Sequence, residues 1–195
     1  MIDRSRFNIY LMSAICLGLA CSCQSPQQKR KRALSTLELH VETNAAEGRG
    51  TELVPIYRQS PVSITVQKQP FLTAANVAEA KVLDAVGGFI LRVQFDRDGT
   101  LLLEQYTSAN RGRHMAIFAQ FADVSADEAS AGDASAWSLK ARLNEGRWLA
   151  APRINQRITD GVLAFTPDAT RQEAEQIAIG LNNVVKKLHG KKPVE

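Results

Sequence analysis

The sequence predicts an α+β protein, in which an antiparallel sheet carries helices on one face. Several short segments alternate apolar and polar residues, which is the period of a half-buried strand. One long segment near the C-terminus instead repeats its apolar residues at helical spacing. Strands and helices combined in this way typically form a sheet covered by helices. With 45% hydrophobic and 23% charged residues among 195, the chain also has the composition of a globular domain.

The first part of the expected domain contains two strands and one helix. Residues 37–41 and 62–66 each alternate apolar with polar side chains, as half-buried strands do. A helix is then expected across 74–86, because Thr73 is a suitable N-cap and a glycine pair follows the segment.

The middle of the chain has the clearest strand pattern. Residues 89–95 alternate strictly, and Asp96–Gly99 has the composition of a turn. The leucine-rich segment 100–108 fits a strand or a short helix, because both periods match it. A second turn is expected at 110–113, followed by a strand over 114–122.

Residues 123–135 carry acidic side chains and no basic one, and we expect an exposed acidic loop there. The alternating carboxylates of a calcium loop are absent. A hairpin is expected from strands at 137–143 and 148–151, in which Trp137 and Trp148 favour cross-strand packing over the lining of a ligand groove.

The last expected elements are strands carried by Ile154, Ile158 and Val162–Phe165, followed by a long helix. Thr166 is expected to cap this helix and Pro167 to occupy its first position, with the helix ending near His189. We expect one helix face to cover the sheet rather than bind a partner. Its apolar residues are Ala174, Ile177, Ala178, Leu181, Val185 and Leu188.

The N-terminus is typical of an exported lipoprotein. Basic residues precede an uncharged stretch, 7–20, which fits the apolar region of a signal peptide and is short for a membrane span. Leu17–Cys21 resembles a lipobox, so Cys21 is the expected lipidation site, with Cys23 as the alternative. Several acyl chains hold a protein firmly at a membrane. Ser22 after the lipidated cysteine favours the outer membrane, facing the periplasm.

The sequence therefore divides into four parts. These are a lipoprotein signal peptide at 1–20, a flexible basic tether at 21–35, an α+β domain at 36–190 and a short tail at 191–195.

Composition and motifs exclude several classes of function. The net charge of +4 does not indicate binding to nucleic acid, because the basic excess lies in the leader and in Lys29–Arg32. No cysteine follows Cys23, which excludes a disulfide framework and a thiolate site from the domain. No motif of a hydrolase, zinc protease or phosphate loop occurs. Because His40, His114 and His189 fall in different expected elements, they are expected to be exposed, and no metal or cofactor is predicted.

Three blocks of sequence, taken in order, carry a family likeness. They are Phe89–Gly99, Thr107–Ile117 and the region from Leu149 through Gly161 to Ala174. Together they resemble the head of the first periplasmic domain of SecD, in the SecDF family. The resemblance implies a ferredoxin-like two-layer sandwich of the α+β class. Residues 123–146 are an insertion relative to that family, and no apolar run long enough to cross a membrane follows residue 23.

The leading hypothesis is a non-enzymatic lipoprotein of the cell envelope that binds extended polypeptide or another envelope protein, for example by lending a sheet edge. A detached accessory of the Sec export machinery is a second hypothesis, and an enzyme with an unrecognised site is a third. The candidate binding residues are Asn110, Gly112 and Arg113, in the turn most like the family. Asparagine and glycine there serve backbone geometry first, which leaves Arg113 as the side chain considered for binding.

Overall fold

The computed structural model describes residues 33–44, 50–121 and 146–189. The segments 1–20, 123–135 and 191–195, together with the tether as far as residue 32, lie outside the described residues. Within the described ranges the elements follow in the order β1 (Ser35–Val41), β2 (Thr51–Ile56), β3 (Val62–Gln67), β4 (Leu72–Thr73), the 3₁₀ helix η2 (Ala74–Asn76), β5 (Val77–Ala85), β6 (Gly88–Phe95), α3 (Arg97–Ala109), β7 (Met115–Phe121), β8 (Arg147–Ala150), β9 (Val162–Phe165) and α5 (Arg171–His189).

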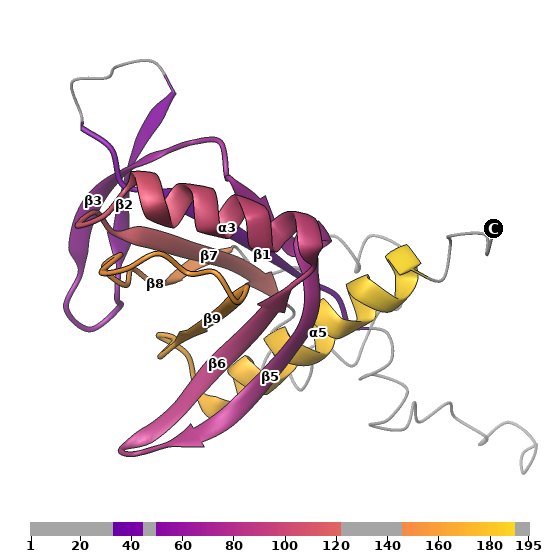
Figure 1. Ribbon diagram of the computed structural model, residues 1–195. Helices are drawn as coiled ribbons and strands as arrows, with labels where there is room; N and C mark the ends of the chain where they lie inside the picture. Colours follow the sequence, from indigo (N-terminus) through magenta and orange to yellow (C-terminus); the bar gives the residue numbers. More distant parts are fainter. Residues whose placement is uncertain (1–32, 45–49, 122–145, 190–195) are drawn as a thin grey trace, which may run out of the picture.

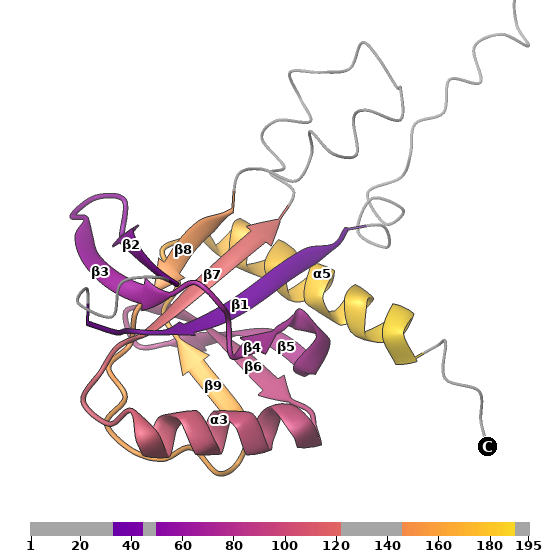
Figure 2. The same ribbon diagram turned by 90° about the horizontal axis from the view of Figure 1, so that it is seen from above.

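The described strands form three antiparallel sheets. The first has the order β4-β1-β7-β8, the second has the order β5-β6-β9, and the third is the β2-β3 hairpin. Figure 2 shows β1, β7 and β8 running side by side, and Figure 1 shows the β5-β6 hairpin as a long arm with α5 alongside it. All pairings between these strands are antiparallel. The predicted α+β class with antiparallel strands is therefore confirmed.

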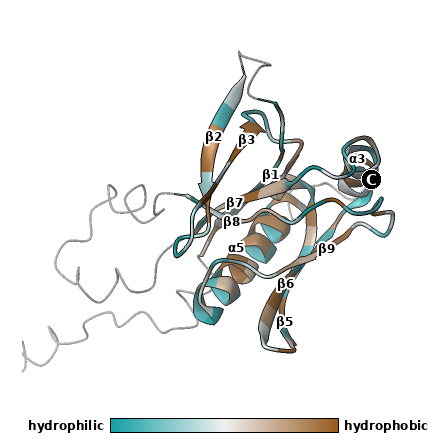
Figure 3. Ribbon diagram, turned by 90° about the vertical axis from the view of Figure 1, so that its left-hand side faces the viewer, coloured by the Kyte–Doolittle hydropathy of each residue, from teal (hydrophilic) through white to brown (hydrophobic). Residues whose placement is uncertain are grey.

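The two α-helices pack mainly against different strands, although both contact β6. α5 contacts β5, β1 and β7, whereas α3 contacts β4 and β6. Figure 3 shows both hydrophobic and hydrophilic residues along α5, and its residues Ala174, Ile177 and Leu181 are 0% exposed. The predicted covering role of this helix is confirmed. Leu188, which was placed on the same face, is 46% exposed, because the last turn of α5 extends beyond the sheet.

Most buried apolar residues belong to one cluster, called the main core below. It joins side chains of both α-helices with side chains of every described strand except β2 and β3. Alternation in β1, β6 and β7 sends every second residue into it, as a half-buried strand requires. Its fully buried large residues are Leu37, Leu39, Leu72, Leu91, Leu103, Ile117, Leu149, Ile177 and Leu181.

A second, smaller cluster lies under the β2-β3 hairpin and is called the hairpin cluster below. Only one of its buried residues comes from outside the hairpin, and that is Ala116 of β7. Trp148 and Ala151 pack against its margin. Its buried residues from the hairpin itself are Val54, Ile56, Ile64 and Val66.

The described chain begins in direct contact with α5. Asn183 Nδ2 donates a hydrogen bond to Ala33 O at 2.9 Å. Gly180 leaves room for the first residues of β1, because a side chain at this position would meet Ser35 Oγ. The start of β1 is therefore held against the C-terminal half of α5.

The helix predicted across 74–86 is wrong. This segment forms η2, which is one turn long, and then the strand β5, which pairs with β6 along its length. Thr73 is a cap as predicted, since its Oγ1 accepts the Ala75 N–H at 3.3 Å. The glycine pair closes the β5-β6 hairpin, with Gly87 at φ +83°. Pairing with β6 and burial against α5 outweigh the helical propensity of the segment.

Residues 100–108, which fitted either a strand or a helix, belong to α3. The expected turn before them is instead the start of this helix, because Asp96 Oδ1 accepts the Gly99 N–H at 2.7 Å as an N-cap. Gly99 also permits close packing, since a Cβ here would lie 2.9 Å from Asn76 Cβ. Only glycine therefore lets α3 lie this close to η2.

The predicted start of the last helix is also wrong. α5 begins at Arg171, not at Pro167. Thr170 and Glu173 form a capping box: Glu173 Oε2 accepts the Thr170 N–H at 2.6 Å, and Thr170 Oγ1 accepts the Glu173 N–H at 3.2 Å. The strands β2 and β4 were not predicted, and Ile154 and Ile158 lie outside any strand. The proposed strand at 137–143 lies outside the described residues.

Candidate functional site

The turn at 110–113 is held by backbone contacts on both sides. Asn110 is the C-cap of α3, and its Nδ2 donates to Tyr106 O at 3.0 Å. Gly112 has φ +83°, a value that favours glycine, and its N–H donates to Ile154 O at 2.8 Å. The backbone role expected for asparagine and glycine is therefore confirmed.

Arg113 lies beside a hydrogen-bonded pair, Glu42 and His114, just after the end of β1. Its Nη1 donates to Glu42 O at 3.3 Å, and Glu42 Oε2 accepts the His114 N–H at 2.7 Å and lies 2.8 Å from His114 Nδ1. Burial raises the pKa of Glu42, but hydrogen bonds from His114 and the charge of Arg113 hold it below its usual value. The structure thus brings the three candidate residues together in one turn, which hydrogen bonds hold in place. Ligand binding by Arg113 stays a prediction.

A cavity of about 380 Å³ lies elsewhere, between the β2-β3 turn and the loop that follows β9. Aromatic, hydroxyl, amide, carboxylate and proline side chains surround it. Sequence reasoning missed this site, because its two halves lie more than a hundred residues apart and belong to no motif. The lining residues are Tyr57, Gln59, Ser60, Thr166, Pro167 and Asp168.

Tyr57, on one wall of this cavity, has a strained backbone. Its φ of +67° is in the left-handed region, and no other non-glycine residue of the described chain has a positive φ. Such a conformation costs about 1–3 kcal/mol and persists only where neighbouring contacts impose it. Its side chain is 41% exposed although it is large and aromatic. Strain of this kind tends to collect at functional sites, and here it adjoins a cavity.

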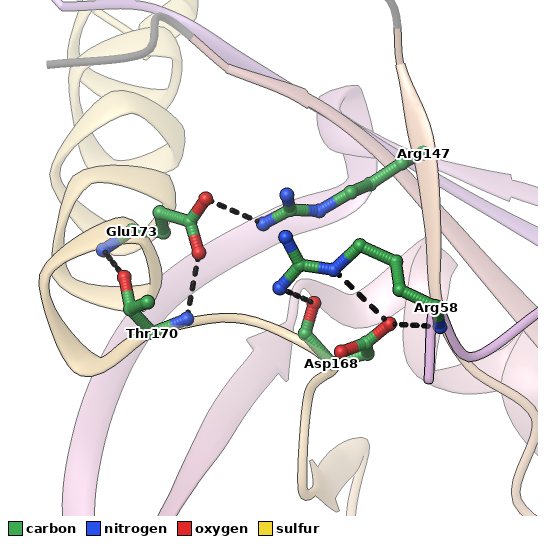
Figure 4. A network of polar contacts seen from close by, with 5 residues as sticks. All are labelled: Arg58, Arg147, Asp168, Thr170 and Glu173. Atoms are coloured by element: carbon green, nitrogen blue, oxygen red, sulfur yellow. Dashed lines mark hydrogen bonds and ion pairs between the residues drawn. The ribbon is translucent and has the colours of Figure 1, made fainter. Parts of the chain in front are cut away.

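Two ion pairs hold the loop between β9 and α5, and Figure 4 shows both of them. The Arg58 N–H donates to Asp168 Oδ2 at 2.7 Å, and Arg58 Nε lies 3.4 Å from the same oxygen. Arg147 Nη2 lies 2.8 Å from Glu173 Oε1. The hairpin turn and β8 therefore both hold the loop between β9 and α5.

Glu173 is ionised by its surroundings. Burial raises its pKa, but the Thr170 N–H and the Arg147 guanidinium together hold the pKa below its usual value. The Arg147 guanidinium also lies 4.9 Å from the centre of the Phe121 ring, a cation–π contact. Glu173 thus serves both as the cap of α5 and as the partner of β8.

The predicted exposure of the histidines is wrong for His40, which is 5% exposed. Its Nδ1 lies 2.8 Å from Gln67 O, so this nitrogen carries the proton. Trp148 packs edge-on against the His40 ring at 5.1 Å and also contacts Phe118, which confirms its packing role. Among the described residues, no group of three histidine, cysteine or acidic side chains is placed to hold a metal ion. Trp137 lies outside the described residues.

A family model for the SecDF P1 head subdomain matches residues 51–184, which run from the start of β2 into the last turns of α5. The chain belongs to the SecDF P1 head family. All three sequence blocks that suggested the resemblance fall inside this match, whereas β1 precedes it. No curated protein matches the chain.

Solved structures of SecDF share the fold of this head domain. One, described as the structure and function of a membrane component SecDF that enhances protein export, has a TM-score of 0.50 at 20% identity, over 85% of this chain and 70% of that one. A crystal structure of SecDF in a super-membrane-facing form has a TM-score of 0.50 at 18% identity, over 82% of this chain and 21% of that one. Within the described part of this SecDF head, no helix is long and apolar enough to cross a membrane.

Proposed function

We propose that this protein is a lipid-anchored SecDF-type head domain of the cell envelope that binds extended polypeptide without catalysing a reaction. The single observation that carries the proposal is the family match over residues 51–184. A related solved protein is described as a membrane component that enhances protein export, which supports a role in contact with exported polypeptides.

The cavity beside Tyr57 supports a binding role. It is a shallow hollow, open to solvent, of about 380 Å³, in which one side chain of a bound polypeptide can lie. Its lining combines an aromatic ring, a proline, neutral polar groups and the Asp168 carboxylate, which Arg58 pairs with. Binding by weak contacts of this kind needs no cofactor.

The lipid anchor belongs to the same proposal. Cys21, with Cys23 as the alternative, lies outside the described residues, as does most of the basic tether. Ser22 after the cysteine favours an outer-membrane position facing the periplasm. The start of the described chain against α5 suits a domain that continues directly from a tether.

Site-specific crosslinking in cells tests the binding role. A photoreactive residue at Gln59, which lines the cavity, should capture exported polypeptides, and the same residue at Leu101, 57% exposed on α3, should not. Equal capture at both positions, or none at Gln59, would contradict polypeptide binding at this cavity.

Mass spectrometry of the mature N-terminus tests the anchor. We expect a lipid-modified Cys21, and the Cys21→Ser variant should remain unprocessed or appear in the soluble fraction. An unmodified N-terminus upstream of Cys21, or lipid on Cys23 alone, would show that the assignment to Cys21 is incorrect.

A second candidate function is that of a detached accessory of the Sec export machinery. The description of the related SecDF as a component that enhances export favours it. The two candidates differ in what is captured. A binding lipoprotein should be crosslinked mainly to passing polypeptides, whereas an accessory should be recovered with the membrane subunits of the translocase.

A further inference from the structure

The outer edge of β9 exposes backbone groups that the sheet does not use. In an antiparallel pair, alternate residues direct their N–H and C=O groups toward the neighbouring strand. The Phe95 N–H donates to Gly161 O at 2.9 Å, and the same register continues to Val93 opposite Leu163. Val162 and Ala164 must therefore direct their backbone groups away from β6.

These outward groups differ in how they are satisfied. The Val162 N–H donates to Asp160 Oδ1 at 3.0 Å. Ala164 is exposed, and no hydrogen bond to its N–H or C=O occurs among the residues that the structure describes. Ala164 is thus an open donor and acceptor pair at the free edge of the second sheet.

The opposite edge of the same sheet is closed. By the same alternation Ala80 of β5 faces outward, but the Asn182 carboxamide pairs with it as a neighbouring strand would. The Ala80 N–H donates to Asn182 Oδ1 at 2.9 Å, and Asn182 Nδ2 donates to Ala80 O at 2.9 Å. Covering an edge with a helix is one way in which proteins prevent strand addition. Here α5 covers the β5 edge, and β9 has no such cover.

The open edge leads directly into the cavity. Thr166 and Pro167, which line it, follow β9 within two residues of its end, and Tyr57 lines it from the hairpin. The cavity therefore begins within two residues of the end of β9, and its far side is closed where the Asp168 N–H donates to Leu149 O of β8 at 2.7 Å.

We propose that an extended polypeptide adds to the second sheet as a strand beside β9 and places one side chain in the cavity against Tyr57. This rests on the proposed function and names its site. Main-chain hydrogen bonds at Ala164 can form with a polypeptide of any sequence, whereas the cavity selects the side chain at one position of that polypeptide. Strand-addition sites commonly divide affinity and specificity in this way. The strand β9 has only four residues. A polypeptide paired with it therefore forms few main-chain hydrogen bonds, and its binding is reversible.

The test uses the full chain and a fluorescent ten-residue peptide of alternating threonine and valine with one central phenylalanine. Ala164→Pro removes the outward donor and leaves the ladder to β6 intact, since edge strands tolerate proline. It should weaken binding by about tenfold, the value of one or two lost hydrogen bonds. The second variant is Tyr57→Asn, because asparagine tolerates the left-handed backbone conformation. It should weaken binding of the peptide with the central phenylalanine. It should not change the affinity for a peptide with alanine at the central position.

Leu53→Pro is the matched control. Leu53 of β2 lies opposite Thr65 of β3. The Thr65 carbonyl accepts the Thr43 N–H at 2.8 Å and therefore faces away from β2. The Leu53 N–H, in the same residue pair, then points away from β3. This second edge proline should change peptide affinity less than about twofold. Equal losses in both proline variants would overturn the assignment to β9.

Amide hydrogen exchange of the unmodified chain gives a readout that needs no variant. Saturating peptide should slow exchange at Ala164 and leave Val82, on the β5 edge, unchanged. A peptide methylated at every second backbone nitrogen should lose both binding and protection. If the peptide binds but does not slow amide exchange at Ala164, the assignment of the binding site to β9 is wrong, whereas the proposed function is not contradicted. If neither this peptide nor a reduced, unfolded protein binds, the proposed function fails as well.

Discussion

The main core and the hairpin cluster differ in how many elements support them. The main core joins both α-helices and seven strands, so losing any one contact leaves many others. The hairpin cluster has four buried residues from two strands and only Ala116 from the body of the protein. Regions with fewer buried contacts open at lower free energy.

The difference places the less stable region at the candidate site. Tyr57, which lines the cavity, lies at the end of the hairpin, whereas Thr166 on the opposite wall follows a strand of the main core. One wall is therefore able to yield while the other stays fixed. A site built in this way adapts to side chains of different size.

The largest effect is expected at Leu181, which is 0% exposed in the main core. Leu181→Ala should lower the free energy of unfolding by about 2–5 kcal/mol, through lost burial and the cavity that remains. Leu188→Ala, on the same helix but 46% exposed, should change it by less than about 0.5 kcal/mol. Chemical denaturation of the full chain measures both. An unchanged denaturation midpoint for Leu181→Ala would contradict the assignment of α5 to the main core.

A matched pair of smaller changes compares the two clusters directly. Ile177 and Ile56 are both 0% exposed, one in each cluster. Replacing either with valine should cost about 0.5–1.5 kcal/mol. Ile177→Val should shift the global midpoint, whereas Ile56→Val should mainly speed amide exchange within β2 and β3. Identical exchange patterns in the two variants would mean that the hairpin and the main core unfold as one unit.

Asp168→Asn tests the link between the hairpin and the loop after β9. It weakens the contacts of Arg58 with the Asp168 carboxylate, and an ion pair of this exposure is worth at most about 1 kcal/mol. We expect trypsin to cleave after Arg58 faster, while the denaturation midpoint changes little. Asp84→Asn is the control, because it breaks the Arg171 contact at the other hairpin and should leave cleavage at Arg58 unchanged.

The smallest effect is expected from pH. The pKa of Glu173 lies below its usual value near 4.5, so its ionised form stabilises the fold above that value and the contribution is lost as pH falls. The difference in stability between the unmodified chain and Glu173→Gln should therefore shrink as the solution is acidified. A constant difference for Glu173→Gln across this range would contradict the role of its carboxylate.

Sequence periodicity predicted the main core well, because it is built from regular alternation. Leu37, Leu91 and Ile117 are buried where strict alternation places them, and Leu181 where helical spacing does. The failure at 74–86 has a physical origin. This segment satisfies a helical cap and apolar spacing, but pairing with β6 is a long-range contact that no local pattern contains.

The candidate site was harder to predict for the same reason. The turn with Asn110 and Gly112 was found, since its residues are adjacent and carry a turn signature. Tyr57 and Thr166 have no local signature, and neither the positive φ of Tyr57 nor the open edge at Ala164 follows from residue type. Both depend on how distant strands end beside one another.

The contact of the chain start with α5 has a mechanical consequence. Gly180 and Asn183 hold Ala33 to Ser35 against the helix, so β1 continues directly from whatever precedes it. A pull on that segment along β1 loads all seven residues of the strand at once, because each is paired with β7 between Ser35 and Val41. The paired residues of β1 and β7 must then all shear past one another at the same time, rather than separate one pair after another. This geometry suits the proposed arrangement, in which a lipid anchor holds the N-terminus while a bound polypeptide is drawn away.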